Sequence, residues 1–282
     1  MRRPRARRRG EAASSLPARH AIALGLLQGP TELLPISSSG HVVLAPALLG
    51  WPYDRLDAPL RKAFEVALHA GTAAGLTVAL RHEVAEVARS LDAPRLIRLF
   101  LATAPATVAG LLLHRPIVGR LSSPRNVAIA QIAAGATMGL ADRRPADRSR
   151  DDTPLLDAVA VGVAQTAALA PGVSRGGAAL TALRLRRLER RSASEISRHA
   201  AAPIVLGAAA LEAARLVRRP PPAALARPFA AGVAASFAST IAAAGLARAM
   251  DDARSYAPLA AYRMALGTIA FARLGRRRPP SG

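Results

Sequence analysis

The chain has 282 residues, of which 51% are hydrophobic and only 3% are aromatic, and its formal net charge at pH 7 is +21. It contains no cysteine, which excludes disulfides and thiolate metal sites. Nucleic-acid binding is not expected despite the basic charge, because the arginines gather at the ends of apolar segments without an aromatic-basic surface. Charges separated in this way from long apolar stretches predict an all-α, polytopic integral membrane protein.

A basic tail precedes the first apolar segment. Residues 1–19 are rich in arginine and contain proline, and we expect them to be disordered or to lie on anionic lipid headgroups. The apolar stretch that follows is too short for the core of a cleaved signal peptide, since it runs directly into Gln28 and Glu32. We therefore expect one membrane-embedded domain over residues 20–275 and a second short tail over residues 276–282.

The first apolar segment is interrupted at residues 28–41, which read QGPTELLPISSSGH. Pro35 lacks a backbone N–H and clashes with the preceding turn, so we expect the helix to break there. The serines at 37–39 supply N-cap oxygens for a second helix. The start of that helix directs free N–H groups and the positive end of a helix dipole toward the break, an arrangement that suits a phosphate.

Further apolar segments follow, and most are slightly shorter than the roughly 20 residues that cross a bilayer. The segments around 21–34 and 155–170 are interrupted by proline and can be re-entrant if their ends are buried in protein. The connectors carry the charge, and the arginine-rich loop at 184–198 is expected on the cytoplasmic side. Small residues such as Gly71 and Gly75 predict close helix packing. The predicted later segments are 63–80, 96–113, 126–141, 155–170, 200–217, 229–247 and 257–272.

The second half of the chain echoes the first break. Residues 25–28 and Pro35 are matched by residues 162–165 and Pro171, and a serine follows the proline in both copies. Each copy is an apolar helix that carries a glutamine, followed by a proline break, a serine cap and a new helix. Paired broken helices in the two halves of a membrane protein predict two pseudo-repeats that meet at a central site.

Polar groups inside apolar segments are costly and therefore mark candidate site residues. Glu32 could be a general base, a ligand for a divalent cation, or a structural ion-pair partner of Arg175. His41 could be a satisfied interior histidine, or it could exchange protons at the break. The guanidinium of Arg175 could bind two phosphate oxygens and stabilise charge in a transition state, or it could reach lipid headgroups.

Three other polar residues are expected to have structural roles. Glu65 and His69 lie one helical turn apart and could line a cavity, although packing or mutual pairing is the favoured interpretation. Arg263 is expected to snorkel to the interface or to form a pair near a helix end.

Two motifs and several shorter stretches point to one family. Residues 28–41 complete the signature E/Q-G-x-T-E…P-x-S-S-x-G-H, and residues 171–177 read PGVSRGG where the second signature is P-G-x-S-R-S-G. On these motifs, the chain resembles the bacterial undecaprenyl-diphosphatases, membrane enzymes linked to bacitracin resistance. Gly176 replaces the family's second serine, and Ala179 replaces a threonine that the family usually carries. HAGT at 69–72, APATVAG at 104–110 and AYRMALG at 261–267 extend the resemblance over roughly residues 20–275.

The resemblance implies hydrolysis of undecaprenyl diphosphate to undecaprenyl phosphate and inorganic phosphate in the bacterial inner membrane, which recycles the lipid carrier of peptidoglycan synthesis. It implies catalytic roles for Glu32, Ser38, His41 and Arg175. Ser38 would be the nucleophile, or would only bind phosphate while water attacks directly. Glu32 would also bind a divalent cation, Mg²⁺ or Ca²⁺. The implied substrate-binding residues are Gln28, Thr31, Ser37, Ser39, Gly172, Ser174 and Gly176.

Other interpretations stay open at this point. A lipid or anion transporter, or a flippase, would share the plan of inverted repeats with broken helices. A degenerate homologue with a structural role would fit the missing hydroxyls at Gly176 and Ala179. A homodimer is compatible with the sequence.

Overall fold

The computed structural model describes residues 16–79, 92–200 and 220–275, together with a few isolated positions between these ranges. Within these ranges the chain is helical, and the only β-type contact is an isolated bridge between Arg148 and Leu188. The predicted all-α class is therefore confirmed. Residues 1–15 and 276–282 of the two predicted tails, and nearly all of the predicted segment 200–217, lie outside the described residues.

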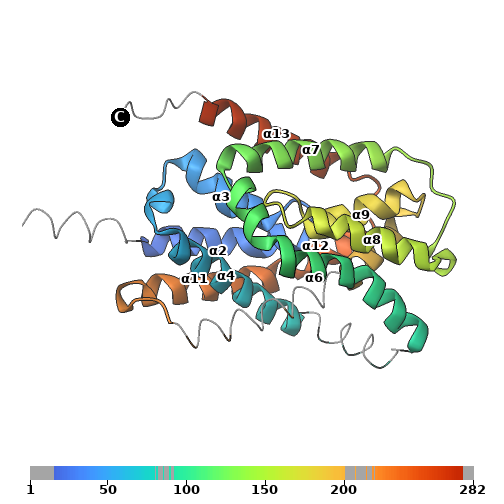
Figure 1. Ribbon diagram of the computed structural model, residues 1–282, viewed down its shortest axis with the longest axis horizontal. Helices are drawn as coiled ribbons and strands as arrows, with labels where there is room; N and C mark the ends of the chain where they lie inside the picture. Colours follow the sequence, from blue (N-terminus) through green and yellow to red (C-terminus); the bar gives the residue numbers. More distant parts are fainter. Residues whose placement is uncertain are drawn as a thin grey trace, which may run out of the picture.

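The helices follow one another along the chain with short connections (Figure 1). Apart from residues 200–217, every predicted apolar segment falls largely within helix. The elements are α2 (Ala18–Leu33), α3 (Ser38–Leu49), η1 (Pro52–Arg55), α4 (Ala58–Ala79), α6 (Ala93–Leu121), α7 (Pro124–Asp142), η2 (Arg150–Asp152), α8 (Leu155–Ala167), α9 (Arg175–Leu185), a helix over residues 190–200, α11 (Ala223–Ala242), α12 (Ala244–Asp251) and α13 (Ala257–Gly275).

Both predicted helix breaks are present. The first lies between α2 and α3 and contains Pro35, and the cap of α3 is Ser37, whose Oγ accepts a hydrogen bond from the Gly40 N–H at 3.2 Å. The second lies between α8 and α9, where Ser174 Oγ accepts from the Gly177 N–H at 3.0 Å. Each cap satisfies one of the N–H groups that a helix start leaves without a partner, which lowers the cost of the interruption in an apolar setting.

The two broken segments are hairpins that point at each other along the long axis of the molecule. Figure 1 shows α2 and α3 reaching inward from one end of the molecule, while α8 and α9 reach inward from the other. The first hairpin packs against α4 and α11, and the second packs against α6. Helix α7 contacts α3, α9 and α13, so it lies beside both hairpins. This arrangement brings the two breaks together in the interior.

Close contacts between helix backbones hold each hairpin against its neighbour. A Cβ atom at Gly25 in α2 would lie 2.4 Å from the Gly232 carbonyl oxygen in α11. A Cβ atom at Gly162 in α8 would lie 2.3 Å from the Leu101 carbonyl oxygen in α6. Gly71 in α4 likewise faces α11, as the small-residue pattern predicted. These glycines allow the backbones to approach at distances that a side chain would prevent.

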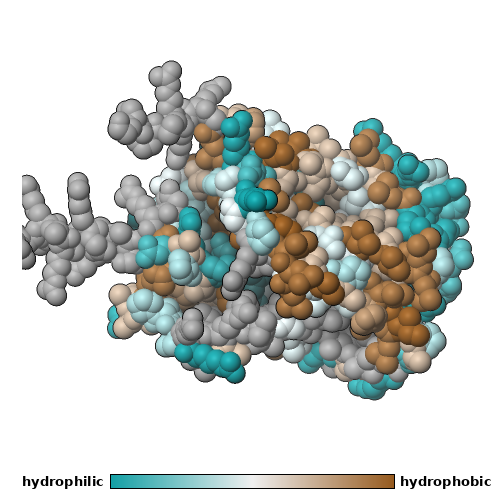
Figure 2. Space-filling view, in the orientation of Figure 1, coloured by the Kyte–Doolittle hydropathy of each residue, from teal (hydrophilic) through white to brown (hydrophobic). Residues whose placement is uncertain are grey.

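Much of the apolar surface remains exposed rather than forming a core. Two helices among the described residues, Ala93–Leu113 and Ala223–Asp251, are long and apolar enough to cross a membrane, and only 11% of the most apolar window of the first is buried. Figure 2 shows apolar side chains over the region where α6 and α8 lie in Figure 1, and hydrophilic residues at the end that carries the α7–α8 connection. Such an exposed apolar face is typical of contact with lipid.

Ion pairs at that hydrophilic end fix the outer end of α9. The carboxylate of Asp142, the last residue of α7, accepts from Arg190 Nε at 2.7 Å and from the Tyr256 N–H at 2.8 Å. The nearby guanidinium of Arg184 is almost fully buried and donates to the Arg144 carbonyl oxygen at 2.7 Å. The arginine-rich loop that follows α9 is therefore tied to α7 and to the start of α13.

Candidate active site

A cavity of about 340 Å³ opens between the two helix breaks. Residues from both hairpins line it, together with residues from α4 and apolar side chains such as Leu76, Leu180 and Met250. The polar residues at its wall that matter most here are Gln28, Glu32, Ser38, His69, Ser174 and Arg175. The cavity thus combines a polar centre with an apolar wall, which suits a ligand that has a charged head and a hydrocarbon chain.

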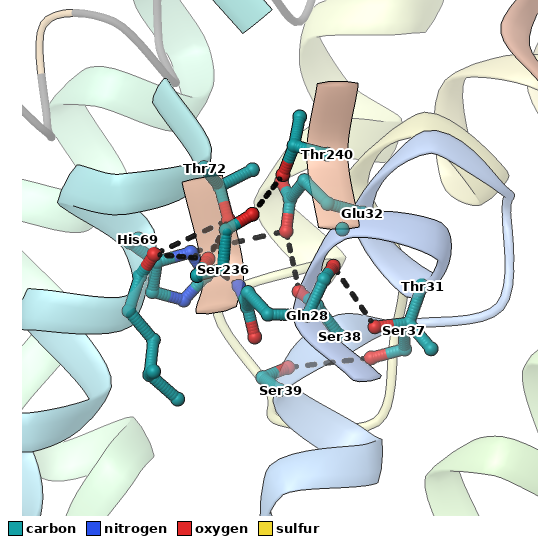
Figure 3. A network of polar contacts seen from close by, with 12 residues as sticks. Gln28, Thr31, Glu32, Ser37, Ser38, Ser39, His69, Thr72, Ser236 and Thr240 are labelled. Carbon is teal, nitrogen blue, oxygen red and sulfur yellow. Dashed lines mark hydrogen bonds and ion pairs between the residues drawn. The ribbon is translucent and has the colours of Figure 1, made fainter. Parts of the chain in front are cut away.

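A short hydrogen bond joins the two sides of the first break. Ser38 Oγ, in the first turn of α3, donates to Glu32 Oε2, in the last turn of α2, at 2.5 Å (Figure 3). The turn between the two helices folds back, and this brings residues six positions apart in sequence face to face. A hydroxyl held by a carboxylate in a partly buried cavity is the arrangement of a nucleophile with its general base.

The hydroxyls of Ser37 and Thr31, next to Ser38 in the site, form hydrogen bonds with the backbone. Ser37 caps α3, and its Oγ also lies 3.2 Å from Ser39 Oγ, which is in the cavity wall. Thr31 lines the cavity as well, but its hydroxyl donates to the Leu27 carbonyl oxygen at 2.6 Å inside α2. Of these hydroxyls, Ser38 alone bonds the carboxylate of Glu32 in the described structure.

Arg175 supplies the positive charge of the second hairpin. It is the first residue of α9, and it lines the same cavity as Glu32. The cap residue Ser174 and the following Gly176 also line the cavity, so the N-terminus of α9 faces it. Gly172, predicted to bind substrate, lies in the turn behind, with a φ of 99° that favours glycine. The site thus receives a guanidinium and a helix N-terminus, two features that bind phosphate.

His41 has the surroundings of a satisfied interior histidine, one of the two alternatives left open by the sequence, and it does not line the cavity. The residue is only 4% exposed. Nδ1 lies 2.7 Å from the Ser37 carbonyl oxygen, and Nε2 lies 2.7 Å from the hydroxyl of Tyr262 in α13. Because a carbonyl only accepts, Nδ1 carries the proton and Nε2 accepts from Tyr262. These two bonds draw the imidazole away from the cavity and stack it against Tyr262.

The imidazole that does reach the cavity belongs to His69 on α4. Its Nδ1 lies 3.0 Å from Gln28 Nε2 and 3.8 Å from Glu32 Oε2. Glu65, one turn earlier, also lines the cavity and pairs with Lys62 at 3.8 Å. Both residues line the cavity, although packing or mutual pairing was the favoured interpretation of their spacing. Their spacing of one helical turn and the HAGT stretch are the sequence signals that could have indicated a shared polar face.

The position of Arg263 differs from the prediction that it snorkels to the interface or forms a pair near a helix end. It neither snorkels nor sits at a helix end, because it is 1% exposed in the middle of α13. Its guanidinium donates to Gln131 Oε1 and to the carbonyl oxygens of Pro35 and Gly172, each at 2.9 Å. The interior of the molecule, rather than the lipid interface, holds this charge.

The two positions that lack the motif hydroxyls differ in their surroundings. Gly176 lines the cavity, and a Cβ atom built there would meet no atom within 4 Å. Ala179 is fully buried and packs in a cluster with Val161 and Leu183. A hydroxyl at 176 would therefore enter the cavity, whereas one at 179 would lie in an apolar core.

Known proteins resemble this chain in sequence over most of its length. The family model described as "Bacitracin resistance protein BacA" matches residues 21–269. The chain is 38% identical over 270 residues to an undecaprenyl-diphosphatase of Trichlorobacter lovleyi, and the match covers 91% of this chain and 97% of the relative. It is 36% identical to undecaprenyl-diphosphatases of Gemmatimonas aurantiaca and Geobacter sulfurreducens, over 91% and 92% of this chain and 98% of each relative.

The open space at Gly176 predicts that a serine there strengthens anion binding. The Gly176→Ser variant should bind inorganic diphosphate about fivefold more tightly, which corresponds to the ~1 kcal/mol of one net hydrogen bond. Isothermal titration calorimetry of the purified protein in detergent measures the affinity. Gly119→Ser is the matched control, because Gly119 also has open space around it but lies in α6 outside the cavity wall. Equal affinity of both variants would show that residue 176 does not face the bound anion.

Proposed function

The chain belongs to the bacitracin resistance protein BacA family, and we propose that it hydrolyses undecaprenyl diphosphate to undecaprenyl phosphate and inorganic phosphate. This reaction recycles the lipid carrier of peptidoglycan synthesis and confers resistance to bacitracin. The observation that carries the proposal is the hydrogen bond between Ser38 and Glu32 in a cavity that also receives Arg175. A lipid or anion transporter built on the same plan needs no nucleophile with its base, so this contact favours hydrolysis over transport.

We further propose that the chain crosses the bacterial inner membrane several times and that its hairpins are re-entrant. The two long apolar helices and the exposed apolar faces of α6 and α8 support this arrangement. The α2–α3 and α8–α9 hairpins are too short and interrupted to cross alone, and their polar backbone ends are buried in protein, as a bilayer requires. The undecaprenyl chain would stay in lipid while its diphosphate enters the cavity.

Two pseudo-repeats form part of the same proposal. The glutamines Gln28 and Gln165 and the cap serines Ser37 and Ser174 are separated by the same number of positions along the chain. The first helix of each hairpin packs against a long apolar helix: α2 packs on α11, and α8 packs on α6. Both glutamines also have a buried amide oxygen without a hydrogen-bond partner among the described residues. These correspondences support a repeat of opposite orientation, as in other membrane proteins with broken helices.

The geometry supports a covalent route through Ser38. Glu32 accepts the hydroxyl proton as Ser38 Oγ attacks the terminal phosphorus, and the bond to the bridging oxygen breaks, so undecaprenyl phosphate leaves. Arg175 and the N–H groups at the start of α9 stabilise the negative charge on the phosphoryl oxygens. Glu32 passes the proton from Ser38 to the departing undecaprenyl phosphate and is a carboxylate again. It then takes a proton from water as the water attacks the phosphoserine, so inorganic phosphate leaves and the Ser38 hydroxyl is restored. Direct attack by water, with Ser38 binding the phosphate, uses the same residues.

His69 and His41 have different roles in this proposal. His69 lies beside Glu32 in the cavity wall, where it can exchange a proton with water or with the departing phosphate. His41 binds the Ser37 carbonyl oxygen and Tyr262, so it acts on Ser38 through the backbone of the serine turn.

A divalent cation fits the oxygen atoms at this site. The amide oxygen of Gln28 is buried without a hydrogen-bond partner among the described residues, and the carboxylate of Glu32 lines the same cavity. Within the described residues no cluster of three His, Asp or Glu side chains could hold a metal. Mg²⁺ nevertheless suits such a sparse set, since it keeps several waters and takes further ligands from phosphate. When bound, the cation would neutralise charge on the diphosphate; Glu32 and Gln28 would hold it.

Replacement of the carboxylate tests the proposed reaction. Purified wild-type protein in detergent should release phosphate from undecaprenyl diphosphate, and Glu32→Gln should lower kcat by about 100-fold or more, the typical size of a lost general base. Glu65→Gln is the matched control, because Glu65 lines the same cavity but pairs with Lys62; it should retain kcat within a few fold. Phosphate release by Glu32→Gln at the wild-type rate would refute the site, and no release by wild type would refute the reaction.

Removal of divalent cations tests the metal proposal separately. Treatment with a chelator should reduce the rate of phosphate release by at least tenfold, because the charge on the diphosphate is no longer neutralised. Added Mg²⁺ or Ca²⁺ should restore the rate. In the Gln28→Leu variant, restoration should need more cation. An unchanged rate after chelation would refute the metal proposal, because Arg175 and the helix N-termini would then neutralise the charge on the diphosphate without a cation.

The two histidines are separated by comparing activity with stability. His69→Gln should lower kcat at least tenfold with little change in thermal unfolding, since His69 lies in the cavity wall. His41→Gln should lower the unfolding temperature as well as kcat, because the buried ring loses its bonds to Ser37 and Tyr262. Full activity of the His69→Gln variant would refute the proton-transfer role proposed for His69.

A further inference from the structure

The two helix breaks share one partner, the guanidinium of Arg263. Nη1 donates to the carbonyl oxygen of Pro35 in the turn between α2 and α3, and Nη2 donates to the carbonyl oxygen of Gly172 in the turn between α8 and α9. Both bonds are 2.9 Å long. The two turns come from different hairpins and from opposite halves of the chain. A single planar group therefore joins the segments that carry the candidate catalytic residues.

Gln131 on α7 completes this connection. Its Oε1 accepts from Arg263 Nε at 2.9 Å, and its Nε2 donates to the Ile36 carbonyl oxygen at 2.9 Å. Two consecutive carbonyls of the first break are therefore held from behind, by α13 and by α7. The side chain of Gln131 is fully buried, so this orientation is set by packing as well as by hydrogen bonds.

Glycines at the start of both new helices make room for the pair. A Cβ atom at Gly40 in α3 would lie 2.7 Å from Gln131 Nε2, and one at Gly177 in α9 would lie 2.9 Å from Arg263 Nη1. The N-termini of the two helices thus approach the same two side chains. The residues that face the cavity, Ser38 on α3 and Arg175 on α9, lie on these same N-terminal turns.

The arrangement is costly, which points to a purpose beyond packing. Arg263 is 1% exposed, and its three hydrogen bonds in the described structure go to neutral oxygens. Burial of a guanidinium among neutral groups is unfavourable, and apolar side chains of similar volume would often stabilise a core better. Polar residues in the interior of membrane proteins are mostly tied to function.

We propose that Arg263, held by Gln131, is a positioning residue that fixes the Glu32–Ser38 pair relative to Arg175. The inference deepens the proposed phosphatase function and rests on it. The phosphoryl group must meet the Ser38 oxygen and the Arg175 guanidinium together, and these come from different hairpins. A displacement of about 1 Å between reacting groups can cost roughly 100-fold in rate. Arg263 acts by bonding the turns and does not line the cavity.

Substitutions at Arg263 distinguish geometry from charge. Arg263→Met removes both, whereas Arg263→Lys keeps the charge but cannot bond three acceptors in one plane. Both variants should lower kcat for phosphate release by about 10- to 100-fold with KM within a few fold. Gln131→Leu removes one support and should give a smaller loss of the same kind. Full activity of a folded Arg263→Met, or full rescue by Arg263→Lys, would overturn the inference.

Arg184 provides the matched control. It is also about 1% exposed and also bonds backbone carbonyl oxygens, but it lies at the far end of α9 outside the cavity wall. Arg184→Lys should lower the unfolding temperature without lowering kcat of the folded protein. If Arg184→Lys and Arg263→Lys lost kcat equally, the effect of Arg263 would be general destabilisation and the inference would fail.

A distance measurement tests the inference without any enzyme assay. The chain has no cysteine, so spin labels can be attached at Leu49→Cys and Leu185→Cys, both exposed and at the outer ends of α3 and α9. Pulsed electron paramagnetic resonance should give a broader or shifted distance distribution between the hairpins in Arg263→Lys than in the parent. An unchanged distribution would refute the positioning role. An absence of phosphatase activity in the parent would refute only the proposed function.

Discussion

The structure depends on how an interrupted helix satisfies its backbone in an apolar interior. Each break leaves N–H groups at a new helix start and carbonyl groups in the turn, and an apolar interior offers no water as a partner for either. Ser37 and Ser174 accept from part of the donors. Arg263 and Gln131 donate to the turn carbonyls. These donors reach the turn carbonyls from behind, outside the cavity, whereas Ser174, Arg175 and Gly176 at the start of α9 line it. A helix N-terminus in that position suits an anion.

This solution of a folding problem also provides the chemistry. A proline break turns α2 back on itself, and the reversal lets Ser38 bond Glu32 across the turn. The same feature in the second half starts α9 at Arg175 and aims its N-terminus at the cavity. Neither hairpin holds both Ser38, the proposed nucleophile, and the guanidinium of Arg175. The proposed reaction therefore requires that the hairpins meet in a defined way, which gives the contacts behind the turns their proposed role beside those in the cavity.

Local chemistry explains which parts of this arrangement the sequence could predict. Proline and serine caps act within a few residues, so both breaks and a serine cap after each follow from the sequence. Only the structure shows that Ser37, rather than Ser38 or Ser39, caps α3. The direction of His41 does not, because Tyr262 comes from a helix more than two hundred positions later. The contacts of His69 and Arg263 also depend on partners from distant parts of the chain, so the sequence does not reveal them. Helical spacing shows which residues share a face, but tertiary packing decides what that face meets.

The proposed repeat accounts for the frame of the site but not for its chemistry. Corresponding positions keep the glutamine, the cap serine and the glycine that follows it, and these residues pack, cap or make room for neighbours. The chemical residues differ between copies. Leu169 stands where the first copy has Glu32, and Arg175 stands where it has Ser38. Two identical hairpins would present either two acids or two cations to the substrate. Neither pair could both activate a nucleophile and neutralise the charge on the phosphate. In this proposal, divergence at these two positions on a matched frame gives one hairpin the proposed nucleophile, Ser38, and the other the positive charge of Arg175.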